Sequence, residues 1–440
     1  MKLLIYIDDN LKQTEFFIDY MRKVVPELMP DVLLTDNSHS TETNKWASVQ
    51  SDFTYIYFEE KTTCGSALNQ VIEGLEIDDD ILITDSYHIP LAESYNRMLD
   101  ALSKEDNSFA IGPLSNSFKW EQHAEWSDAE AALDWTEATV DYKTEEVLML
   151  QTGVILFGRN VVHGSDTFYD DARDMDNLIV EKCVREHLNH LKMYVCCNSG
   201  FYDVRGKGYQ LTLHADIDML EKEFGIHYLN VRGNDWLLSL LEKCEDLKDD
   251  IRVLEVGCDC GGTLFGIKKL YKNAQLYGTD INKGAIRFAS EFAEVKVNNI
   301  EDHNLDFGRN DFDVIVFGDV LEHLRDPLGT LIFCKKLLKK GGRIVTSIPN
   351  LMNIGVMKQL LDGNFTYSEI GLLDKTHIHM FTYNEIIRMF VHDAGYQIEK
   401  ITMNGSFNDE EEKLADELVK LGNAEKFMYR AFQYQVVARL

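Results

Sequence analysis

Short apolar runs alternate with amphipathic segments along the first half of the chain. The runs "KLLIYI", "DVLLTD" and "DILITD" occupy residues 2–7, 31–36 and 80–85, and segments with helical spacing lie between them. Short strands that are apolar on both faces are typical of a parallel sheet covered by helices. The pattern therefore predicts an α/β fold for this half.

The second half repeats this alternation from residue 251 onward, and its end adds two strands around a last helix. The expected strands are residues 251–257, 274–280, 312–319, 343–349, 396–404 and 429–440, and the expected helices are 261–271, 282–292, 327–342 and 408–422. Repeated strand–helix units predict a Rossmann-like sheet with helices on both faces.

A chain of 440 residues is too long for one typical core, and no sequence repeat relates the two halves. We expect an N-terminal domain over residues 1–208, a helical linker over 209–235 and a C-terminal domain over 236–440. The linker is expected to be helical because its apolar residues recur at helical spacing.

The net charge of the protein limits the kinds of partner that it is expected to bind. The formal net charge is −30, and residues 1–208 hold 17 Lys and Arg against 38 Asp and Glu. Such a surface repels phosphate backbones and anionic lipid, which disfavours nucleic acid and membrane surfaces as partners.

No apolar stretch reaches the roughly 20 residues that span a bilayer, and the eight cysteines form no zinc-type spacing. We expect a cytoplasmic protein with free thiols, and the oligomeric state stays open.

The stretch "VLEVGCDCGG", residues 253–262, is the most specific chemical signal. An apolar strand runs into Gly257 and Gly261, which let a ligand approach the backbone without a Cβ in the way. Asp280 ends the next strand, where a carboxylate can accept both hydroxyls of a ribose, and Asp319 ends "VIVFGD". Taken singly, these features are also explained by a tight turn and by solvated carboxylates.

Together with "NNIED" and "FDVIVFGDVLEHLRDP", these motifs closely resemble the class I S-adenosylmethionine-dependent methyltransferases. The resemblance implies a seven-stranded Rossmann-like domain with S-adenosylmethionine as cofactor. It places Glu255, Gly257 and Gly261 beside the methionine part and Asp280 on the ribose. The same resemblance implies that Ile300 and Glu301 flank the adenine and that Asp319 lies near the methionine amino group.

Asp259 departs from this family, whose Gly-x-Gly-x-Gly loop has a glycine at that position. We expect the residue to be tolerated if its backbone angles are ordinary for a non-glycine residue.

Methyl transfer to a hydroxyl requires an aligned nucleophile and a base. The candidate bases are His323, His377 and His379, and Asp374 could orient His377. A histidine bonded only to backbone is the alternative for His323. The segment "SIPN" followed by "GLLDKTHIHMFTYNEI" is similar to that of methyltransferases acting on sugars and cell-surface glycans. Whether oxygen, nitrogen or carbon is methylated stays open.

In the first half, "LLTDNSHS", "CGSALNQVIEGLEIDDDILITDSYHIPL" and "DTFYDDARDMDNLIVEKC" resemble the inverting family 2 glycosyltransferases. The resemblance implies a glycosyltransferase A-like αβ domain that binds a nucleotide-sugar through Asp36, Asn69 and Asp85. It implies that Asp85 holds Mn²⁺ or Mg²⁺ on the diphosphate and that Asp174 is the catalytic base. Such a reaction needs a cation on its leaving group and a carboxylate for the attacking hydroxyl.

The expected metal motif is altered, since Asp85 is followed by Ser86 and Tyr87 where that family has a second acid. Losing one carboxylate weakens the binding of a hard cation. His88 is the alternative ligand.

Two functional interpretations follow, and both make the chain an enzyme. In the first, a glycosyltransferase and a methyltransferase are fused in a bifunctional protein of glycan biosynthesis, with a nucleotide-sugar and a sugar or glycan acceptor as partners. In the second, favoured by Tyr87, the N-terminal domain is a non-catalytic recognition module for the methyltransferase. An inactive scaffold is disfavoured because the glycine loop and Asp280 are intact.

Overall fold

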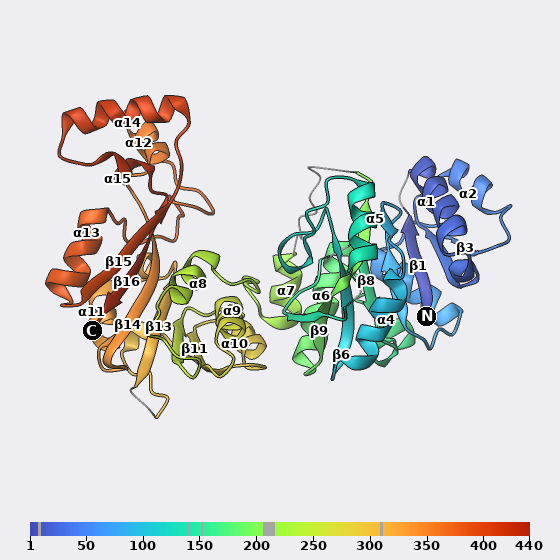
Figure 1. The fold of residues 1–440 in the computed structure, drawn as a ribbon, viewed down its shortest axis with the longest axis horizontal. Coiled ribbons are helices and arrows are strands. Elements are labelled where there is room, and N and C mark those ends of the chain that lie inside the picture. The colour runs from blue at the N-terminus through green and yellow to red at the C-terminus, as the bar shows by residue number, and fades with distance from the viewer. Residues whose placement is uncertain (8–9, 140, 152, 206–215, 309–310) are drawn as a thin grey trace. The chain divides into compact units, whose positions relative to one another are not determined.

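The computed structural model describes residues 1–7, 10–139, 141–151, 153–205, 216–308 and 311–440. The chain forms two compact units, Met1–Leu220 and Glu221–Leu440. Each unit is built around its own sheet (Figure 1). The start of the expected helical linker, residues 209–215, lies outside the described residues.

The first unit holds a mixed sheet of nine described strands in the order β3-β2-β1-β4-β8-β6-β9-β5, with β7 paired to β9. Its strands are β1 (Lys2–Ile7), β2 (Val32–Asp36), β3 (Thr54–Tyr57), β4 (Ile81–Thr84), β5 (His88–Pro90), β6 (Ser108–Ser115), β7 (Thr144–Val147), β8 (Val154–Phe157) and β9 (Lys192–Asp203). Its helices are α1 (Leu11–Val24), α2 (Thr41–Ala47), α3 (Cys64–Gly74), α4 (Ser94–Lys104), α5 (Ala129–Ala138) and α6 (Met175–Leu188), and α7 (Ile217–Phe224) crosses into the second unit.

Strand β1 is the point where the strand order of this sheet reverses. It pairs in parallel with β2 on one side and with β4 on the other, whereas β8 runs antiparallel to β4. Its side chains Leu3, Ile5 and Ile7 belong to one buried cluster with Phe17 and Ile18 of α1. Open α/β sheets bind ligands outside the carboxyl ends of strands at such a reversal.

The second unit holds a seven-stranded sheet in the order β12-β11-β10-β13-β14-β16-β15. The strands from β12 to β14 are parallel, and β16 runs antiparallel to both β14 and β15. The seven-stranded Rossmann-like sheet expected from the sequence is therefore confirmed. Its strands are β10 (Arg252–Val256), β11 (Gln275–Asp280), β12 (Glu294–Val297), β13 (Phe312–Gly318), β14 (Leu338–Pro349), β15 (Gln397–Asn404) and β16 (Gln433–Arg439).

The helices of the second unit are α8 (Asp235–Glu242), α9 (Gly262–Leu270), α10 (Lys283–Ala289), α11 (Pro327–Cys334), α12 (Ile354–Leu361), α13 (Tyr383–Ile387), α14 (Asp409–Leu421) and α15 (Lys426–Arg430). In two of the expected elements, part of the predicted range belongs to a different element. The helix expected over residues 327–342 ends at Cys334, because Leu338 already pairs with Phe312 in the sheet. The strand expected over 429–440 begins only at Gln433, because α15 precedes it.

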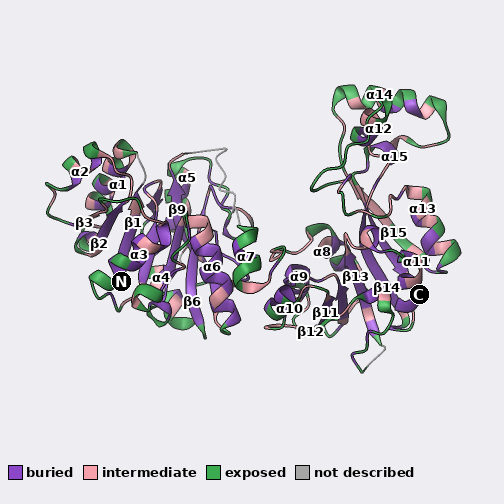
Figure 2. Cartoon of the chain, turned by 180° about the vertical axis from the view of Figure 1, so that it is seen from behind, coloured by how far each residue is buried: buried purple, intermediate pink, exposed green. Residues whose placement is uncertain are grey.

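Alternating side chains of β13 supply the two cores of this unit. Val314 and Val316 pack with α8 and α9 on one face, whereas Ile315 and Phe317 pack with α11 on the other. The strands of both units are largely buried, whereas the outer faces of the helices are exposed (Figure 2). Helices α12, α14 and α15 form a separate small cluster around Ala415 and Tyr429 (Figure 1).

None of the eight cysteines, all of them within the described residues, forms a disulfide. Every helix in the described part of the chain is too short or too polar to cross a membrane.

Candidate functional site

The glycine loop after β10 is held in a conformation that requires glycine. Gly257 and Gly261 have φ angles of +71° and +81°, in the left-handed region that glycine enters freely. The amides of Gly257 and Cys258 both donate to the carbonyl of Thr279, at 2.8 and 3.1 Å. A Cβ on Gly257 would lie 2.6 Å from Cγ2 of Val320. The loop is thus fixed against β11 and closely packed.

Asp259 does not have the ordinary backbone angles expected for it, since its φ is +45°. This explains why a glycine suits the position, although aspartate enters the left-handed region more readily than most residues. Its carboxylate accepts a hydrogen bond from the amide of Asn230 at 2.9 Å, and its own amide donates to Oδ2 of Asp280 at 3.0 Å. Burial, with the nearby Asp280 charge, raises the pKa of Asp259 to about 7.

A cavity of about 920 Å³ opens at the carboxyl edge of the second sheet. It reaches from the glycine loop to the loop that follows α12, and Asn298 lies in its wall. Six of the seven residues expected to bind the methyl donor line it: Glu255, Gly257, Asp280, Ile300, Glu301 and Asp319. The seventh, Gly261, shapes the turn behind it.

Glu255 lies at the base of this cavity and is 3% exposed. Burial raises its pKa to about 8, and its Oε2 has no hydrogen-bond partner among the described residues. Burial likewise raises the pKa of Asp319, whose Oδ1 accepts from Nε2 of Gln433 at 2.6 Å. A cationic ligand suits these carboxylates, because it would restore the favourable interactions that they lose on burial.

Glu301 lines the cavity and also stabilises a neighbouring turn. Its Oε1 accepts from the amides of Arg325 and Asp326, at 2.7 and 2.9 Å. It therefore fixes the turn that leads into α11, directly after His323.

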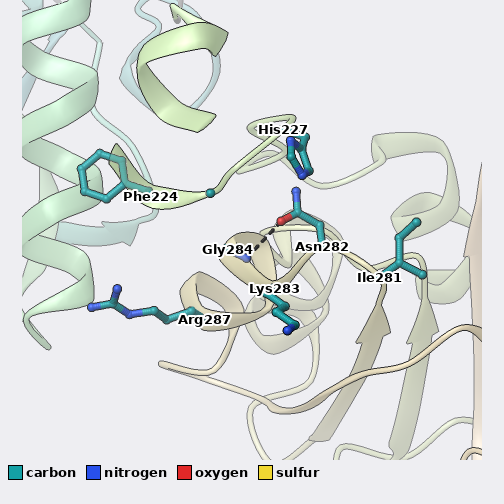
Figure 3. Close-up of a pocket in the computed structure, with 8 residues that line it drawn as sticks. Phe224, His227, Ile281, Asn282, Lys283, Gly284 and Arg287 are labelled. Atoms are coloured by element: carbon teal, nitrogen blue, oxygen red, sulfur yellow. Dashed lines mark hydrogen bonds between the residues drawn. The ribbon is translucent and has the colours of Figure 1, made fainter. Parts of the chain in front are cut away.

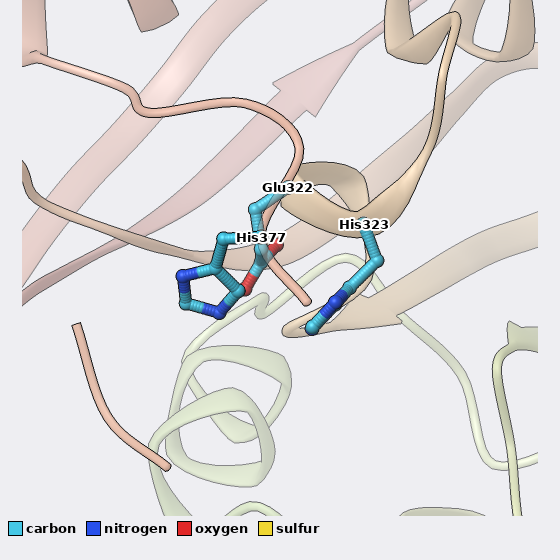
Figure 4. A group of neighbouring side chains, drawn as sticks. All are labelled: Glu322, His323 and His377. Carbon is cyan, nitrogen blue, oxygen red and sulfur yellow. The ribbon is translucent and has the colours of Figure 1, made fainter. Parts of the chain in front are cut away.

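His323 and His377 meet beside the cavity, with ring centroids 4.8 Å apart (Figure 4). Nδ1 of His323 lies 3.2 Å from the carbonyl oxygen of Thr376, and Nδ1 of His377 lies 3.2 Å from that of Leu372. Asp374, the expected orienting partner of His377, instead accepts from the amide and hydroxyl of Thr376. The third histidine considered, His379, has its Nε2 3.1 Å from the carbonyl oxygen of Arg325.

Several cavity residues were not expected from the sequence. Tyr228, Asn230 and Arg232 lie in a non-helical segment between α7 and α8, within the range assigned to a helical linker. Glu322, which precedes His323, lies with its Oε1 4.0 Å from Nε2 of His377, and its side chain is 1% exposed. The signal for Glu322 was its position next to His323 after the strand end.

A second, smaller pocket of about 530 Å³ lies at the start of α10 (Figure 3). Lys283 and Arg287 contribute its positive charge, and the Asn282 side chain caps the helix by accepting from the amide of Gly284. Ile281 borders both pockets.

In the first unit, the residues that were expected to bind a nucleotide-sugar form hydrogen bonds with neighbouring residues. Asp36 accepts from the Tyr55 hydroxyl at 2.6 Å, and Asn69 donates to the Phe168 carbonyl at 2.8 Å. Asp174, expected as a base, caps helix α6 by accepting from the amide of Asn177.

Asp85 follows β4 at the point where the strand order reverses. Its Oδ1 accepts from the amides of Tyr87 and His88 and lies 2.7 Å from Nδ1 of His88. Its Oδ2 lies 3.7 Å from the guanidinium of Arg205. His88 is fully buried, with Nε2 3.0 Å from Ser117 and 3.4 Å from Asp203. These contacts occupy the groups that were expected to hold a metal ion.

Comparison with known proteins finds matches to the second unit. Residues 226–401 match the family model Methyltransf_23, a methyltransferase domain. Phosphoethanolamine N-methyltransferase 1 of Triticum aestivum is 30% identical over 132 residues, which are 29% of this chain and 26% of that protein. A ubiquinone biosynthesis O-methyltransferase of Vibrio cholerae is 31% identical over 138 residues, 30% of this chain and 54% of that protein. Across the first curated relatives, the chain spans 26% to 64% of their length.

Among solved structures, magnesium protoporphyrin IX methyltransferase from Synechocystis, with bound SAH, matches at 14% identity and a TM-score of 0.33, covering 47% of this chain and 80% of that one. The glycine loop, the carboxylates at the strand ends and the family match agree with one another. Residues 226–401 are a methyltransferase domain of the class I, S-adenosylmethionine-dependent type.

Proposed function

We propose that the second unit transfers a methyl group from S-adenosylmethionine to a hydroxyl of a sugar or glycan. The observation that carries the proposal is the cavity at the carboxyl edge of the sheet, with a buried acid at its base that has one unpartnered oxygen and with two histidines at its side. S-adenosylmethionine supplies a methyl group on a sulfonium centre, so its cationic part suits Glu255 and Asp319.

Different residues along the cavity contact different parts of the donor and the acceptor. Asp280 accepts the ribose hydroxyls, Ile300 lies against the adenine, and the glycine loop leaves room for the methionine part. His323 and His377 lie beyond Asp319, where they activate the acceptor hydroxyl. Polar side chains on this side, such as Asp374 and Thr376, suit a polyhydroxylated acceptor. The O-methyltransferase names of several relatives support oxygen as the methylated atom.

Methyl transfer with labelled S-adenosylmethionine tests this proposal. We expect label to enter a free sugar or a glycan and not phosphoethanolamine. Transfer of the label to phosphoethanolamine alone would show that the acceptor is an amine and not a sugar hydroxyl. Absence of donor binding in calorimetry would reject the site itself.

For the first unit we propose a recognition module that binds a nucleotide-sugar at the carboxyl ends of β1 and β4. The specific observation is Asp85 at the reversal of the strand order, beside Arg205. An arginine can contact a diphosphate directly while keeping a carboxylate partner, and Arg205 pairs with Asp203 at 2.6 Å, whereas the Asp85 carboxylate is already occupied by His88. A second catalytic centre, with Asp174 as base and Mn²⁺ at Asp85, is the alternative.

Titration of the full chain with UDP-, GDP- and dTDP-sugars distinguishes these roles. Metal-independent binding without release of free nucleotide supports a recognition module. Binding that requires Mn²⁺ and ends in nucleotide release supports a glycosyltransferase, and absence of binding rejects both.

A further inference from the structure

Glu322, His323 and His377 form a compact group beside the methyl-donor cavity (Figure 4). The first two belong to the short 3-10 turn Leu321–His323 after β13, and His377 belongs to the loop between α12 and α13. One potential ligand atom from each residue lies within 4.8 Å of the others. Two segments distant in sequence therefore bring two imidazoles and one carboxylate together.

The Glu322 carboxylate is the unusual member of the group. Its side chain is 1% exposed, and neither oxygen has a hydrogen-bond partner among the described residues. Its backbone carbonyl accepts from the amides of Ile378 and His379, at 2.8 and 3.0 Å, which fixes the residue against the His377 loop. A buried carboxylate without a partner requires either a proton or a cation.

In each of the two histidines, hydrogen bonding at Nδ1 leaves Nε2 as an acceptor. In both rings Nδ1 contacts a backbone carbonyl, which only accepts, so Nδ1 carries the hydrogen and Nε2 keeps its lone pair. Nε2 of His377 lies 4.0 Å from Oε1 of Glu322.

This arrangement matches what metal sites need around their ligands. Histidines that bind a metal almost always donate their other ring nitrogen to a carbonyl or a carboxylate. Two imidazoles with one carboxylate suit Zn²⁺ and similar transition metals rather than Mg²⁺ or Ca²⁺, which favour oxygen ligands. Ligands of a tetrahedral Zn²⁺ lie about 3.4 Å apart, so small side-chain rotations would close the observed separations.

We propose that Glu322, His323 and His377 bind a divalent transition-metal ion, such as Zn²⁺, on the acceptor side of the methyl-donor cavity. His323 also lines that cavity, so an ion bound to it would lie at the cavity wall. The role of the ion rests on the function proposed above: it binds the acceptor hydroxyl and lowers its pKa, and the hydroxyl proton passes to water. The oxygen then attacks the methyl carbon, so that the new C–O bond forms as the C–S bond of the donor breaks.

Metal binding is measured on the full chain without methyl donor, after removal of metal with a chelator. We expect one equivalent of Zn²⁺ to bind in calorimetry, one equivalent of Co²⁺ to produce visible absorption bands, and Mg²⁺ to bind far more weakly. Zn²⁺ should also raise the melting temperature of the unmodified protein. No binding of Zn²⁺ or Co²⁺ by the unmodified protein would overturn the proposal, whatever the variants do.

Two variants locate the site. Glu322→Gln and His377→Gln should each weaken Zn²⁺ binding at least tenfold, whereas His392→Gln, an exposed histidine of the same unit, should not. Equal binding by Glu322→Gln and the unmodified chain would overturn the assignment and leave a protonated Glu322. Donor binding is titrated separately without metal, so its failure counts against the proposed function and not against the metal site.

Discussion

The amide of Asp259 donates a hydrogen bond to Oδ2 of Asp280 across 3.0 Å. This contact joins the glycine loop after β10 to the end of β11, so one carboxylate both shapes the loop and faces the cavity. Oδ1 of Asp280 accepts from the amide of Asn282 and thereby fixes the start of α10. The residue expected to hold the ribose is therefore positioned by both loops that border the cavity.

Replacing Asp280 by Ala should weaken donor binding about 10- to 100-fold, since a hydrogen bond to a charged group contributes about 1.5–3 kcal/mol. Calorimetric titration with S-adenosylmethionine measures the change. Asp302→Ala removes an exposed carboxylate nearby and serves as the control. Undiminished affinity in Asp280→Ala, with a normal melting temperature, would refute the ribose assignment.

Gly257→Ala should destabilise the protein and impair donor binding, because it combines an unfavourable φ with a contact of 2.6 Å to Val320. Gly363→Ala is the matched control, since Gly363 has a φ of +77° but no atom within 4 Å of an added Cβ. Backbone strain alone costs on the order of 1 kcal/mol. Chemical denaturation should therefore show a clearly larger loss for Gly257→Ala, and equal losses would contradict close packing of the loop.

Asp174→Ala should lower the free energy of unfolding by about 1 kcal/mol, because it removes the cap of α6. Asp174→Asn should preserve that stability, since asparagine caps equally well. Denaturation of both variants measures the difference. If the unmodified protein releases nucleotide from a nucleotide-sugar and Asp174→Asn does not, the residue acts as a base and our recognition module is wrong.

Several of the cavity residues that the sequence predicts lie directly at strand ends. Asp280 ends β11 and Asp319 follows β13, and the position of a strand end is a local property of the chain. Parallel strands bring such ends to one edge of the sheet, so their proximity could be inferred without a structure.

Other features depend on contacts between distant segments, which no local pattern encodes. Tyr228 and Arg232 reach the cavity from a segment without clear periodicity, and the partner of His377 is the Leu372 carbonyl rather than Asp374. In the first unit, Tyr55 occupies the Asp36 carboxylate from the neighbouring strand. The sequence indicates which side chains can take part in binding or catalysis. It does not indicate which of them already form hydrogen bonds with residues from distant segments.

Donor binding should release protons near neutral pH, because the pKa of ligand-free Glu255 is about 8 and a cationic ligand beside it lowers that value. The affinity should accordingly rise from pH 6 to pH 8. Calorimetry at pH 7 in two buffers with different ionisation enthalpies counts the protons released. The Glu255→Gln variant should release fewer protons when the donor binds. The protons that it still releases should come from Asp259, whose pKa is about 7.

The same ionisation governs the stability of the ligand-free protein. The folded state keeps a proton on Glu255 that the unfolded state loses near its ordinary pKa of 4.5, so stability should fall as pH rises from about 4.5 to 8. Glu255→Gln should flatten this decline, whereas Glu294→Gln, on an exposed residue of β12, should not. Melting temperatures measured from pH 5 to pH 9 test it, and parallel curves for Glu255→Gln and the unmodified protein would show that Glu255 is already ionised in the cavity.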